Sequence, residues 1–488
     1  MEMNKRGLVQ LFSQINAWIK TIDDLVWGLP LIIFILAVGI YLTLRLGLLQ
    51  VRHLPKAFKF MFQKEEGHGE VTSFGALCTA LSATIGTGNI VGVATALAVG
   101  GPGALFWMWA AAFFGMATKY AEGLLAIKYR TICEDGHVLG GPFYYIENGM
   151  GKRWKWLAKV FAFFGAGVGL LGIGTFTQVN GITSAVKNVF DSGVQHTVTL
   201  PFGEYSWAVI IMGLILTLCV GLVVLGGIQR IAKVSEVVVP FMAVLYVVVC
   251  LVILALNFKA IPDAFMQIFR GAFGLDAVAG GAIGAMMVAM QKGVARGIFS
   301  NESGLGSAPI AAAAAKTKEP VRQGLVSMTG TFIDTIVICT MTGLSIVIAG
   351  SWNPAVTGKE LEGVDITIHA FQQALPFPAA VSSCILMLCL AFFAFTTILG
   401  WNYYGERCVE YLANGSMTTV MVYRYLYILA IFIGPYMTVE AVWNIADIFN
   451  GLMAFPNLIA LCALSGVVIR ETKSYFNDRL GGEHQERP

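Results

Sequence analysis

The feature that most constrains this chain is a series of apolar segments, each about as long as a membrane is thick. A helix needs about 20 apolar residues to cross the hydrocarbon core of a bilayer. Of the 488 residues, 57% are hydrophobic and 12% are charged, whereas soluble domains have about 25% charged residues. We therefore predict an all-α polytopic membrane protein with about 11 transmembrane helices, near residues 28–49, 74–98, 103–127, 155–189, 206–227, 236–257, 264–298, 323–349, 378–403, 424–439 and 444–469.

Lysine and arginine are distributed unevenly over the connections between these segments. Alternate connections on one side carry Arg45, Arg52, Lys56, Lys59, Lys64, Lys128, Arg130, Lys152, Arg153, Lys155, Lys159, Arg230, Lys233, Lys292, Arg296, Lys316, Lys318, Arg322, Arg407, Arg424, Arg470, Lys473, Arg479 and Arg487. The other side carries only Lys5, Arg6, Lys20, Lys259, Arg270 and Lys359. Because loops rich in lysine and arginine stay in the cytoplasm, we expect the N-terminus outside and the C-terminus in the cytoplasm.

The same sequence disfavours several classes of protein. The loops near 50–72, 128–154, 299–322 and 350–377 are too short for a soluble core and carry no nucleotide-binding loop, so we do not expect an ATP-driven pump. The net charge of +3 is explained by the cytoplasmic loops rather than by nucleic acid binding, and the nine cysteines show no metal-ligand spacing. We read residues 7–20 as an interfacial helix, not as part of a cleaved signal peptide.

One predicted span is interrupted by glycine and polar residues. Residues 79–92 read TALSATIGTGNIVG, which places Gly86, Gly88 and Gly92 beside Thr87 and Asn89. Within a bilayer, unwound backbone is stable only where it is buried in protein or lines a cavity. A broken helix offers free N–H groups to a carboxylate and free carbonyl groups to a cation. The alternative is that these glycines serve only the close packing of helices.

A second interruption is predicted five spans later. Residues 273–287 read FGLDAVAGGAIGAMM, with Gly280, Gly281 and Gly284 near the middle and Asp276 about one turn ahead. Paired interruptions in two halves of a chain indicate an inverted repeat with the binding site between the halves. We therefore predict a five-helix repeat at 71–257 and a second, inverted one at 258–470. Residues 1–70 would add the interfacial helix, an extra span and a loop, and residues 471–488 a cytoplasmic tail.

Several long motifs point to a known family. They are SATIGTGNIVGVATALAVGGPGALFWMW, GGPFYYIENGMG, VARGIFSNESGLGSAPIAAAAA and FTTILGWNYYGE. On these motifs the chain resembles the alanine or glycine:cation (sodium) symporter family of the amino acid-polyamine-cation superfamily, from about residue 30 to 470. The resemblance implies a leucine-transporter-type fold, with ten core helices arranged as five plus five inverted. It also implies sodium-coupled uptake of alanine or glycine across a bacterial cell inner membrane.

The resemblance also implies which residues bind the substrate. We expect the backbone N–H groups of Thr87 and Gly88 to bind the substrate carboxylate. Asp276 matches an acidic position of the family and would receive the substrate ammonium, directly or through water. Its alternative role is a structural ion pair with Arg270. A carboxylate inside a membrane is functional by default, which favours the first role.

Three further positions match the family's pocket. Gln178 would fix the orientation of the substrate. Thr397 and Trp401 lie four residues apart and therefore on one face of a helix. The indole of Trp401 would close the pocket around a small side chain, although an interfacial anchor is the alternative reading of this tryptophan.

A sodium site is expected by analogy with the fold. Its ligands would be the backbone carbonyls of Ala83 and Gly86 and the hydroxyl of Thr396 or Thr397. None of these groups titrates near pH 7, so the set favours sodium over a proton. Asp334 is the rival coupling residue, as a proton carrier, as a second cation ligand, or as a structural partner of Thr331 or of a neighbouring helix.

Four other polar residues complete the candidates. Lys119 and Glu122, three residues apart, are expected to pair while the lysine extends toward the cytoplasm. Asn301 and Glu302 match a family signature and are placed in a cytoplasmic loop rich in glycine and alanine, with a role in gating.

The sequence therefore predicts a secondary active symporter, not an enzyme. A small neutral amino acid, alanine or glycine, would enter with sodium by alternating access, with membrane lipid as the surroundings and without a cofactor or nucleic acid. The alternatives are a proton-coupled symporter or an exchanger of the same fold, and less plausibly a channel. The sequence leaves the choice between alanine and glycine, the stoichiometry and the oligomeric state open.

Overall fold

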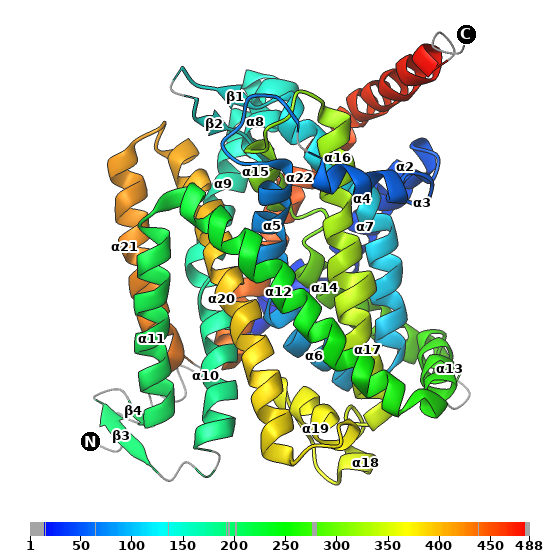
Figure 1. The fold of residues 1–488 in the computed structure, drawn as a ribbon, viewed down its shortest axis with the longest axis vertical. Coiled ribbons are helices and arrows are strands. Elements are labelled where there is room, and N and C mark those ends of the chain that lie inside the picture. The colour runs from blue at the N-terminus through cyan, green and yellow to red at the C-terminus, as the bar shows by residue number, and fades with distance from the viewer. Residues whose placement is uncertain are drawn as a thin grey trace.

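The chain folds into a bundle of helices with two short β-hairpins (Figure 1). The structure is a computed structural model that describes residues 14, 16–63, 65–134, 136–191, 193, 196–200, 203–275, 281–437 and 439–483. Residues 16–26 are helical and precede the labelled elements. The symbol η marks short 3₁₀ or π-helical segments.

The bounds of the elements follow the chain. The first half contains α2 (Leu29–Arg45), α3 (Leu49–Arg52), α4 (Leu54–Phe62), α5 (Ser73–Thr84), η1 (Gly88–Gly92), α6 (Val93–Gly100), α7 (Gly103–Lys128), β1 (Thr131–Ile132), β2 (Val138–Leu139), α8 (Pro142–Tyr144), η2 (Tyr145–Gly149), η3 (Lys152–Trp154), α9 (Lys155–Leu171), α10 (Phe176–Phe190), β3 (Thr197–Leu200), β4 (Gly203–Ser206), α11 (Trp207–Val224) and α12 (Gly227–Leu256). The second half contains η4 (Phe258–Ala260), α13 (Ile261–Ala272), α14 (Ala282–Asn301), α15 (Ala308–Ala313), α16 (Pro320–Thr331), η5 (Phe332–Cys339), α17 (Thr340–Ala349), α18 (Pro354–Thr357), α19 (Val364–Ala374), α20 (Ala379–Leu412), α21 (Met417–Ile433), η6 (Gly434–Tyr436) and α22 (Val439–Glu483).

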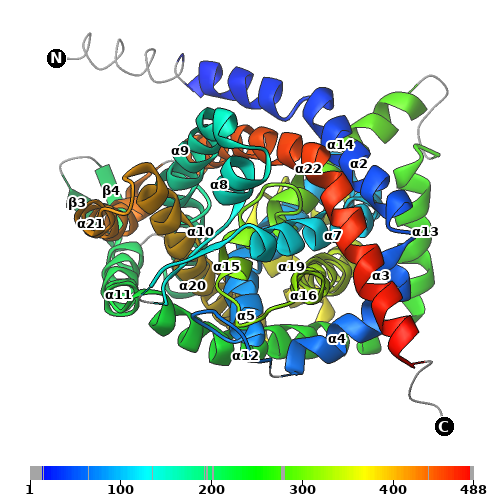
Figure 2. The same cartoon turned by 90° about the horizontal axis from the view of Figure 1, so that it is seen from above.

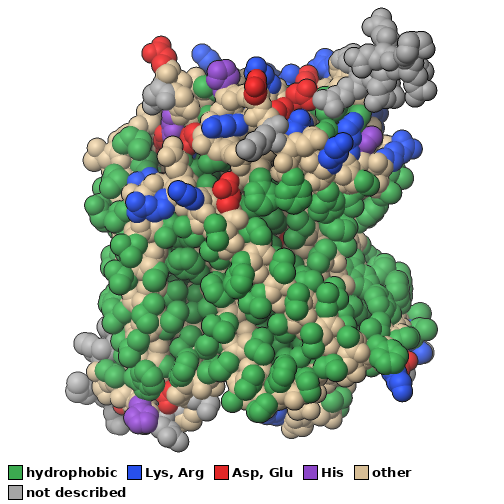
Figure 3. All heavy atoms as spheres, in the orientation of Figure 1, with side chains coloured by type: hydrophobic (Ala, Val, Ile, Leu, Met, Phe, Trp, Pro, Cys, Tyr) green, Lys and Arg blue, Asp and Glu red, His purple; other side chains and the backbone are tan. Residues whose placement is uncertain are grey.

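The molecule has two polar ends and an apolar girdle between them. One end holds α4, the β1–β2 hairpin and α15, and Lys and Arg side chains gather there, so we call it the basic face (Figure 3). The other end holds α18, α19 and the β3–β4 hairpin, and we call it the α19 face. Hydrophobic side chains cover the surface between the two ends (Figure 3). This arrangement is that of a multi-pass membrane protein.

When helices are counted as spans by their length and apolarity, the number is lower than the predicted eleven. Within the described ranges, eight helical segments are long and apolar enough to cross a membrane, or nine if α5 and the helix after it count as one bent span. The long helix α7 is not among them, and it carries the buried polar residues Lys119 and Glu122. The count of eleven therefore stays a prediction, as does the division into repeats at 71–257 and 258–470.

The first predicted interruption is confirmed. Helix α5 ends at Thr84, and Ile85 has extended backbone with ψ of 93°. The helical axis bends by 51° between Ser73–Thr84 and Gly88–Gly100. A π-helical turn, η1, restarts the helix at Gly88, and all five of its residues are buried. Such turns are frequent at functional sites.

A second unwound segment lies at 302–307, between α14 and α15. Glu302 there has left-handed backbone with φ of 57°, and Gly304 and Gly306 have φ of 89° and 82°. Asn301, Glu302 and the residues that follow are buried, so the segment is not an exposed loop, and its cytoplasmic side stays a prediction. The reason is that their polar groups bond to other buried helices, which no local pattern shows.

The predicted interruption around Gly280 and Gly281 lies partly outside the described residues, because 276–280 are not described. Helix α14 begins at Ala282, directly after Gly281, and Gly284 lies inside its first turn. On either side of the gap, Leu275 and Ile283 expose 66% and 70% of their side chains.

A further interruption separates α9 from α10, within the span predicted at 155–189. The break covers residues 172–175. A Cβ atom added to Gly174 would lie 2.7 Å from Cβ of Trp401, so the break is packed directly against α20. Since α10 starts immediately after it, the break sets the position of Gln178.

Candidate functional site

Three helices meet at Gly86, inside the first broken helix. A Cβ atom added to Gly86 would lie 2.4 Å from Oγ1 of Thr397 on α20 and 3.1 Å from Oε1 of Gln178 on α10. The hydroxyl of Thr397 donates a hydrogen bond to the carbonyl of Ile85 over 3.1 Å. The structure therefore brings three of the predicted site residues together, and only glycine fits between them.

The backbone N–H groups of the break are held by side-chain oxygens. Oε1 of Gln178 accepts a bond from the N–H of Thr87 over 3.1 Å, and Oδ1 of Asn89 accepts one from Gly86 over 2.9 Å. The hydroxyl of Thr87 is buried and has no hydrogen-bond partner among the described atoms. Unpaired buried polar groups are costly, and N–H groups at a helix start attract anions. The break is thus equipped to bind a carboxylate.

The second unwound segment approaches the first near the end of α14, where Ser300 lies close to Gly88. A Cβ atom added to Gly88 would lie 3.2 Å from Cα of Ser300. Past the end of α14, the N–H groups of Ser303 and Gly304 bond to Oδ1 of Asn301 and Oε1 of Glu122, over 2.9 and 3.2 Å. The carbonyl of Ser300, one turn before Gly304, therefore does not receive the bond it would have in a continuous helix. The two unwound segments therefore approach each other where Ser300 lies against Gly88.

Asp334 connects the two broken helices. Its carboxylate accepts hydrogen bonds from Nδ2 of Asn89 over 2.7 Å, from Oγ of Ser300 over 2.9 Å and from Oγ1 of Thr335 over 2.7 Å. The side chain is fully buried on η5. Of its predicted partners, Thr331 bonds to Ser303 instead. Asp334 therefore fixes the distance between the helices that carry the two breaks.

Not all members of the predicted sodium site lie at the first break. Ala83 is packed against α20, because a Cβ atom on Gly400 would lie 2.7 Å from its nitrogen. The hydroxyl of Thr396 points away from the break, toward Sδ of Met242 on α12 at 3.4 Å and the carbonyl of Phe393 at 3.0 Å. Of the two threonines, Thr397 thus contacts the break and Thr396 does not.

Trp401 is fully buried, so the alternative of an interfacial anchor is excluded. Its indole nitrogen has no hydrogen-bond partner within the described part of the chain. Asp276, the remaining predicted ligand, lies outside the described residues.

The lysine of the predicted pair with Glu122 does not extend toward water. Lys119 is only 3% exposed, and Nζ has no hydrogen-bond partner in the described structure. Oε1 of Glu122 accepts instead from Gly304 and from Nδ2 of Asn457 on α22. The expected pair is therefore replaced by a contact of α7 with the second break and with α22.

A cavity of about 620 Å³ opens beside the first break. It is lined by Val91 near the break and by Thr177 and Gly181, which flank Gln178 on α10. Further lining residues include Arg296 and the chain just before α19, at 360–363. The cavity therefore lies between the first broken helix, α10 and the α19 face, while Thr87, Gln178 and Thr397 themselves are buried.

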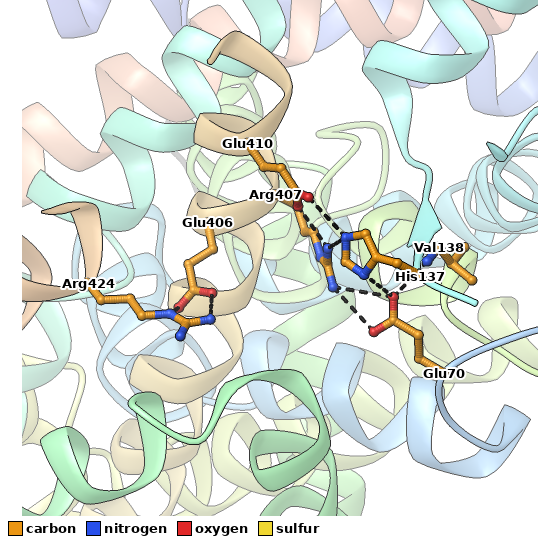
Figure 4. A network of polar contacts seen from close by, with 7 residues as sticks. All are labelled: Glu70, His137, Val138, Glu406, Arg407, Glu410 and Arg424. Carbon is orange, nitrogen blue, oxygen red and sulfur yellow. Dashed lines mark hydrogen bonds and ion pairs between the residues drawn. The ribbon is translucent and has the colours of Figure 1, made fainter. Parts of the chain in front are cut away.

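At the basic face lies a network that we call the polar latch, made of Glu70, His137, Arg407 and Glu410 (Figure 4). Nδ1 of His137 lies 3.0 Å from Glu70 and Nε2 lies 2.9 Å from Glu410. Arg407 contacts Glu410 at 2.8 Å and Glu70 at 3.3 Å. The latch therefore joins the segment before α5 and the β1–β2 hairpin to α20.

Charge balance in the polar latch shifts the pKa values of its groups outside the membrane. The hydrogen bonds to Glu410 and Glu70 raise the pKa of His137 to about 9. Burial alone would raise the pKa of Glu70, but its bond to His137 and the charge of Arg407 lower it below the ordinary value. Nη1 of Arg407 also lies 2.6 Å from Nε2 of His137, and its charge opposes protonation of the ring, so the two basic groups share the two carboxylates. On the same helix, Glu406 pairs with Arg424 at 2.7 Å (Figure 4).

The sequence did not indicate the roles of Asn89 and Ser300, whose side chains bond to Asp334. Asn89 directly follows the predicted break, and an amide there is the one signal that a local reading offers. The partner of its side chain, Asp334, is 245 positions away.

Comparison with known proteins identifies the family of the chain. The profile described as the Sodium:alanine symporter family matches residues 12–487. An uncharacterized transporter of Haemophilus influenzae is 54% identical over 475 residues, covering 97% of this chain and 98% of that protein. The sodium/alanine symporter AgcS of Methanococcus maripaludis is 49% identical over 463 residues, with 94% and 96% covered. The probable sodium/glutamine symporter GlnT of Bacillus subtilis is 38% identical over 465 residues, with 94% and 91% covered.

Among solved structures, that of MhsT in complex with L-phenylalanine superposes with a TM-score of 0.54 at 12% sequence identity. The match covers 83% of this chain and 98% of the other. At this level of identity the likeness concerns the fold alone.

Proposed function

Because the chain belongs to the sodium:alanine symporter family, we propose that it takes up alanine or glycine together with sodium. The observation that supports this proposal most directly is the convergence of Gly86, Gln178 and Thr397. At that point the broken helix offers N–H groups and carbonyl groups, and Thr397 adds a hydroxyl. The N–H groups suit the carboxylate of an amino acid, and the carbonyl and hydroxyl oxygens suit a hard cation.

The substrate carboxylate binds to the N–H groups of Thr87 and Gly88. In the structure Gln178 holds the N–H of Thr87, so its amide oxygen stands where a carboxylate oxygen of the substrate would stand. On binding, Gln178 turns aside and its NH₂ group donates to the same carboxylate. The exchange leaves no N–H group of the break without a partner.

The substrate ammonium lies on the side of α14. Asp276 is its proposed partner, and the carbonyl of Ser300 near the end of α14, which Gly304 leaves without its helical bond, is a second acceptor. Trp401, buried on α20, limits the length of the side chain. One additional methylene changes discrimination by about 1–3 kcal/mol, so the preference for a small substrate is graded.

Sodium binds on the other side of the break. Its ligands are the hydroxyl of Thr397 and the backbone carbonyls of Ala83 and Gly86, with that of Ile85 adjacent to Thr397. Sodium prefers such a set of neutral oxygens, and the cation would compensate the partial negative charge at the end of α5. Thr396, whose hydroxyl faces α12, contributes less than Thr397.

Alternating access follows from the two ends of the molecule. With the α19 face outside and the basic face in the cytoplasm, the cavity of about 620 Å³ is the outer path. The polar latch closes the inner path, and its opening releases sodium and substrate. The C-terminus is then cytoplasmic and the N-terminus external.

A proton-coupled symporter is the second candidate. It is favoured by one observation, the buried position of three carboxyl groups, Asp334, Glu122 and Glu302, between the broken helices. A proton carried by one of them would replace sodium as the coupling ion.

The test is uptake of radiolabelled amino acids into proteoliposomes, with the sodium gradient, the pH gradient and the membrane potential set separately. A potential of 100 mV acting on one coupled charge supports roughly 50-fold accumulation. We expect uphill uptake of alanine or glycine that needs sodium, and weaker uptake of glutamine. Uptake that follows a pH gradient without sodium would favour the proton, and uptake of glutamine alone would reject the proposed substrate.

A further inference from the structure

A cavity of about 730 Å³ lies at the basic face, between the end of α2, the helix α4 and the C-terminal part of α22. Its size is within the range of about 300–1,000 Å³ that is typical of small-molecule sites. None of its described lining residues is an aspartate or a glutamate. Its basic lining residues are Arg45, His53, Lys56, Lys59 and Lys473.

A tight turn brings these residues together. Gly47 and Leu48 have left-handed backbone with φ of 64° and 58°, directly after α2. The turn folds α3 and α4 back across the basic face instead of letting α2 continue. From above, the end of α22 passes beside α2 and α3 (Figure 2). Left-handed backbone at a leucine is costly and persists only where the surroundings enforce it.

Two acidic residues near the described part of the cavity, Glu471 and Glu65, pair with cations that do not line it. Glu471 on α22 contacts Lys128 at 2.8 Å. Glu65, after α4, contacts Arg322 at 3.3 Å. The lining of the cavity therefore retains an excess of positive charge.

Aromatic rings hold one of the lysines in place. Nζ of Lys56 lies 5.2 Å from the ring centre of Phe476 and 5.7 Å from that of Phe60. Cation–π contacts of this kind position an ammonium group. His53 stacks on Phe476 at 4.1 Å, and burial together with the charges of Lys56 and Arg52 lowers the pKa of this histidine.

Exposed apolar side chains flank the basic cavity. Leu44 and Val51 are 71% and 58% exposed, and Phe62 is 70% exposed. The cavity thus combines basic lining residues with exposed apolar side chains on the neighbouring helices. Neighbouring apolar and basic residues are typical of the boundary between acyl chains and headgroups.

We propose that this cavity binds the headgroup of one anionic phospholipid. The phosphate lies among Arg45, Lys56, Lys59 and Lys473, and the acyl chains extend along the exposed side chains of Leu44 and Val51. Basic pockets between transmembrane helices on the cytoplasmic side are suited to such headgroups. The bound lipid ties the extra N-terminal helix α2 to α22, and it does so independently of the proposed substrate.

Native mass spectrometry of the purified full chain tests the proposal, with phosphatidylglycerol and phosphatidylcholine as probes. We expect one phosphatidylglycerol molecule to be retained about tenfold better than phosphatidylcholine. The triple variant Lys56→Gln, Lys59→Gln and Lys473→Gln should lose this preference. A matched control, with three exposed basic residues replaced outside the cavity, should keep it: Lys152→Gln, Arg153→Gln and Lys159→Gln.

Three outcomes would overturn the proposal. They are equal retention of the two lipids, unchanged preference in the triple variant, and a thermal stabilisation by millimolar inorganic phosphate as large as that by phosphatidylglycerol. The last outcome would identify a site for a soluble anion. Should the triple variant fail to fold, the double variant Lys59→Glu and Lys473→Glu provides the test, because both side chains are exposed.

Discussion

Gln178 accepts a hydrogen bond from the backbone N–H of Thr87 over 3.1 Å, although the two residues are 91 positions apart. The bond connects α10 to the first broken helix at the point where the helix has lost its own acceptor. An amide oxygen is a weaker acceptor than a carboxylate, because charge-assisted hydrogen bonds are roughly twice as strong. A substrate carboxylate can therefore displace Gln178 from this N–H group.

This relationship predicts the effect of Gln178→Glu. The new carboxylate has the same shape, occupies the N–H of Thr87 more strongly, and repels the substrate carboxylate. We expect the KM for alanine to rise at least tenfold while the protein remains folded. Uptake kinetics and thermal unfolding measure the two effects. Gln372→Glu is the control, because Gln372 lies on α19 and bonds to Ser383; equal kinetics of the two variants would contradict the assigned role.

A glycine pair in the same broken helix gives a second prediction. At Gly86 an added Cβ meets Thr397 at 2.4 Å, whereas at Gly92 it meets nothing within 4 Å. We expect Gly86→Ala to cost about 1–3 kcal/mol of unfolding free energy and to abolish sodium-dependent uptake. Gly92→Ala should keep uptake and stability, since alanine favours helix. Thermal unfolding measures the stability of both variants, and sodium-dependent uptake measures their activity. An active Gly86→Ala protein would show that the three helices do not meet closely at this residue.

The first break could be predicted because Gly86 and Gly88 interrupt a sequence that is apolar on both sides. In contrast, the segment 302–307 is polar and is followed, after the short α15, by Lys316 and Lys318, so it has the local pattern of a surface loop. Its bonds to Glu122 on α7, to Asn457 on α22 and to Thr331 on α16 hold it inside the protein. Such long-range partners leave no periodic signal in a single sequence.

The residues of the candidate site also differ in whether the local sequence could predict them. Thr87 and Gly88 could be identified from the physics of a broken helix, but Gln178 and Thr397 were predicted through the family resemblance alone. The contact of Thr397 with Ile85 crosses 312 positions. The difference between Thr396 and Thr397 depends on the rotation of α20, which neighbouring threonines in a sequence do not reveal.

That rotation supplies a third prediction. We expect Thr397→Val to raise the sodium concentration for half-maximal uptake at least tenfold, which corresponds to about 1.4 kcal/mol. Thr396→Val should change it less than threefold, because the hydroxyl of Thr396 bonds to Met242 and to its own helix. Sodium titrations of uptake at fixed alanine measure both values. The reverse order would place the cation on the α12 side of α20.

The polar latch gives a prediction for pH. The pKa of His137 is raised from 6.5 to about 9 by its bonds to Glu410 and Glu70. The stabilisation is therefore fully present below pH 6.5 and is lost as the pH rises through about 9. The shift corresponds to at most about 3 kcal/mol. We expect about 1–2 kcal/mol, because the side chain is 28% exposed and solvent screens the charges.

Thermal unfolding of wild type and His137→Gln between pH 6 and pH 10 measures this contribution. The wild type should unfold at a higher temperature at pH 7, and the difference should shrink toward pH 10 as the ring loses its proton. His196→Gln is the control, since His196 is exposed just before β3 at the other end of the molecule. A difference that stays constant with pH would mean that His137 acts through packing. Because Glu70 and Glu410 come from the two segments that the ring connects, a pH-dependent difference would instead show that its charge holds the basic face closed.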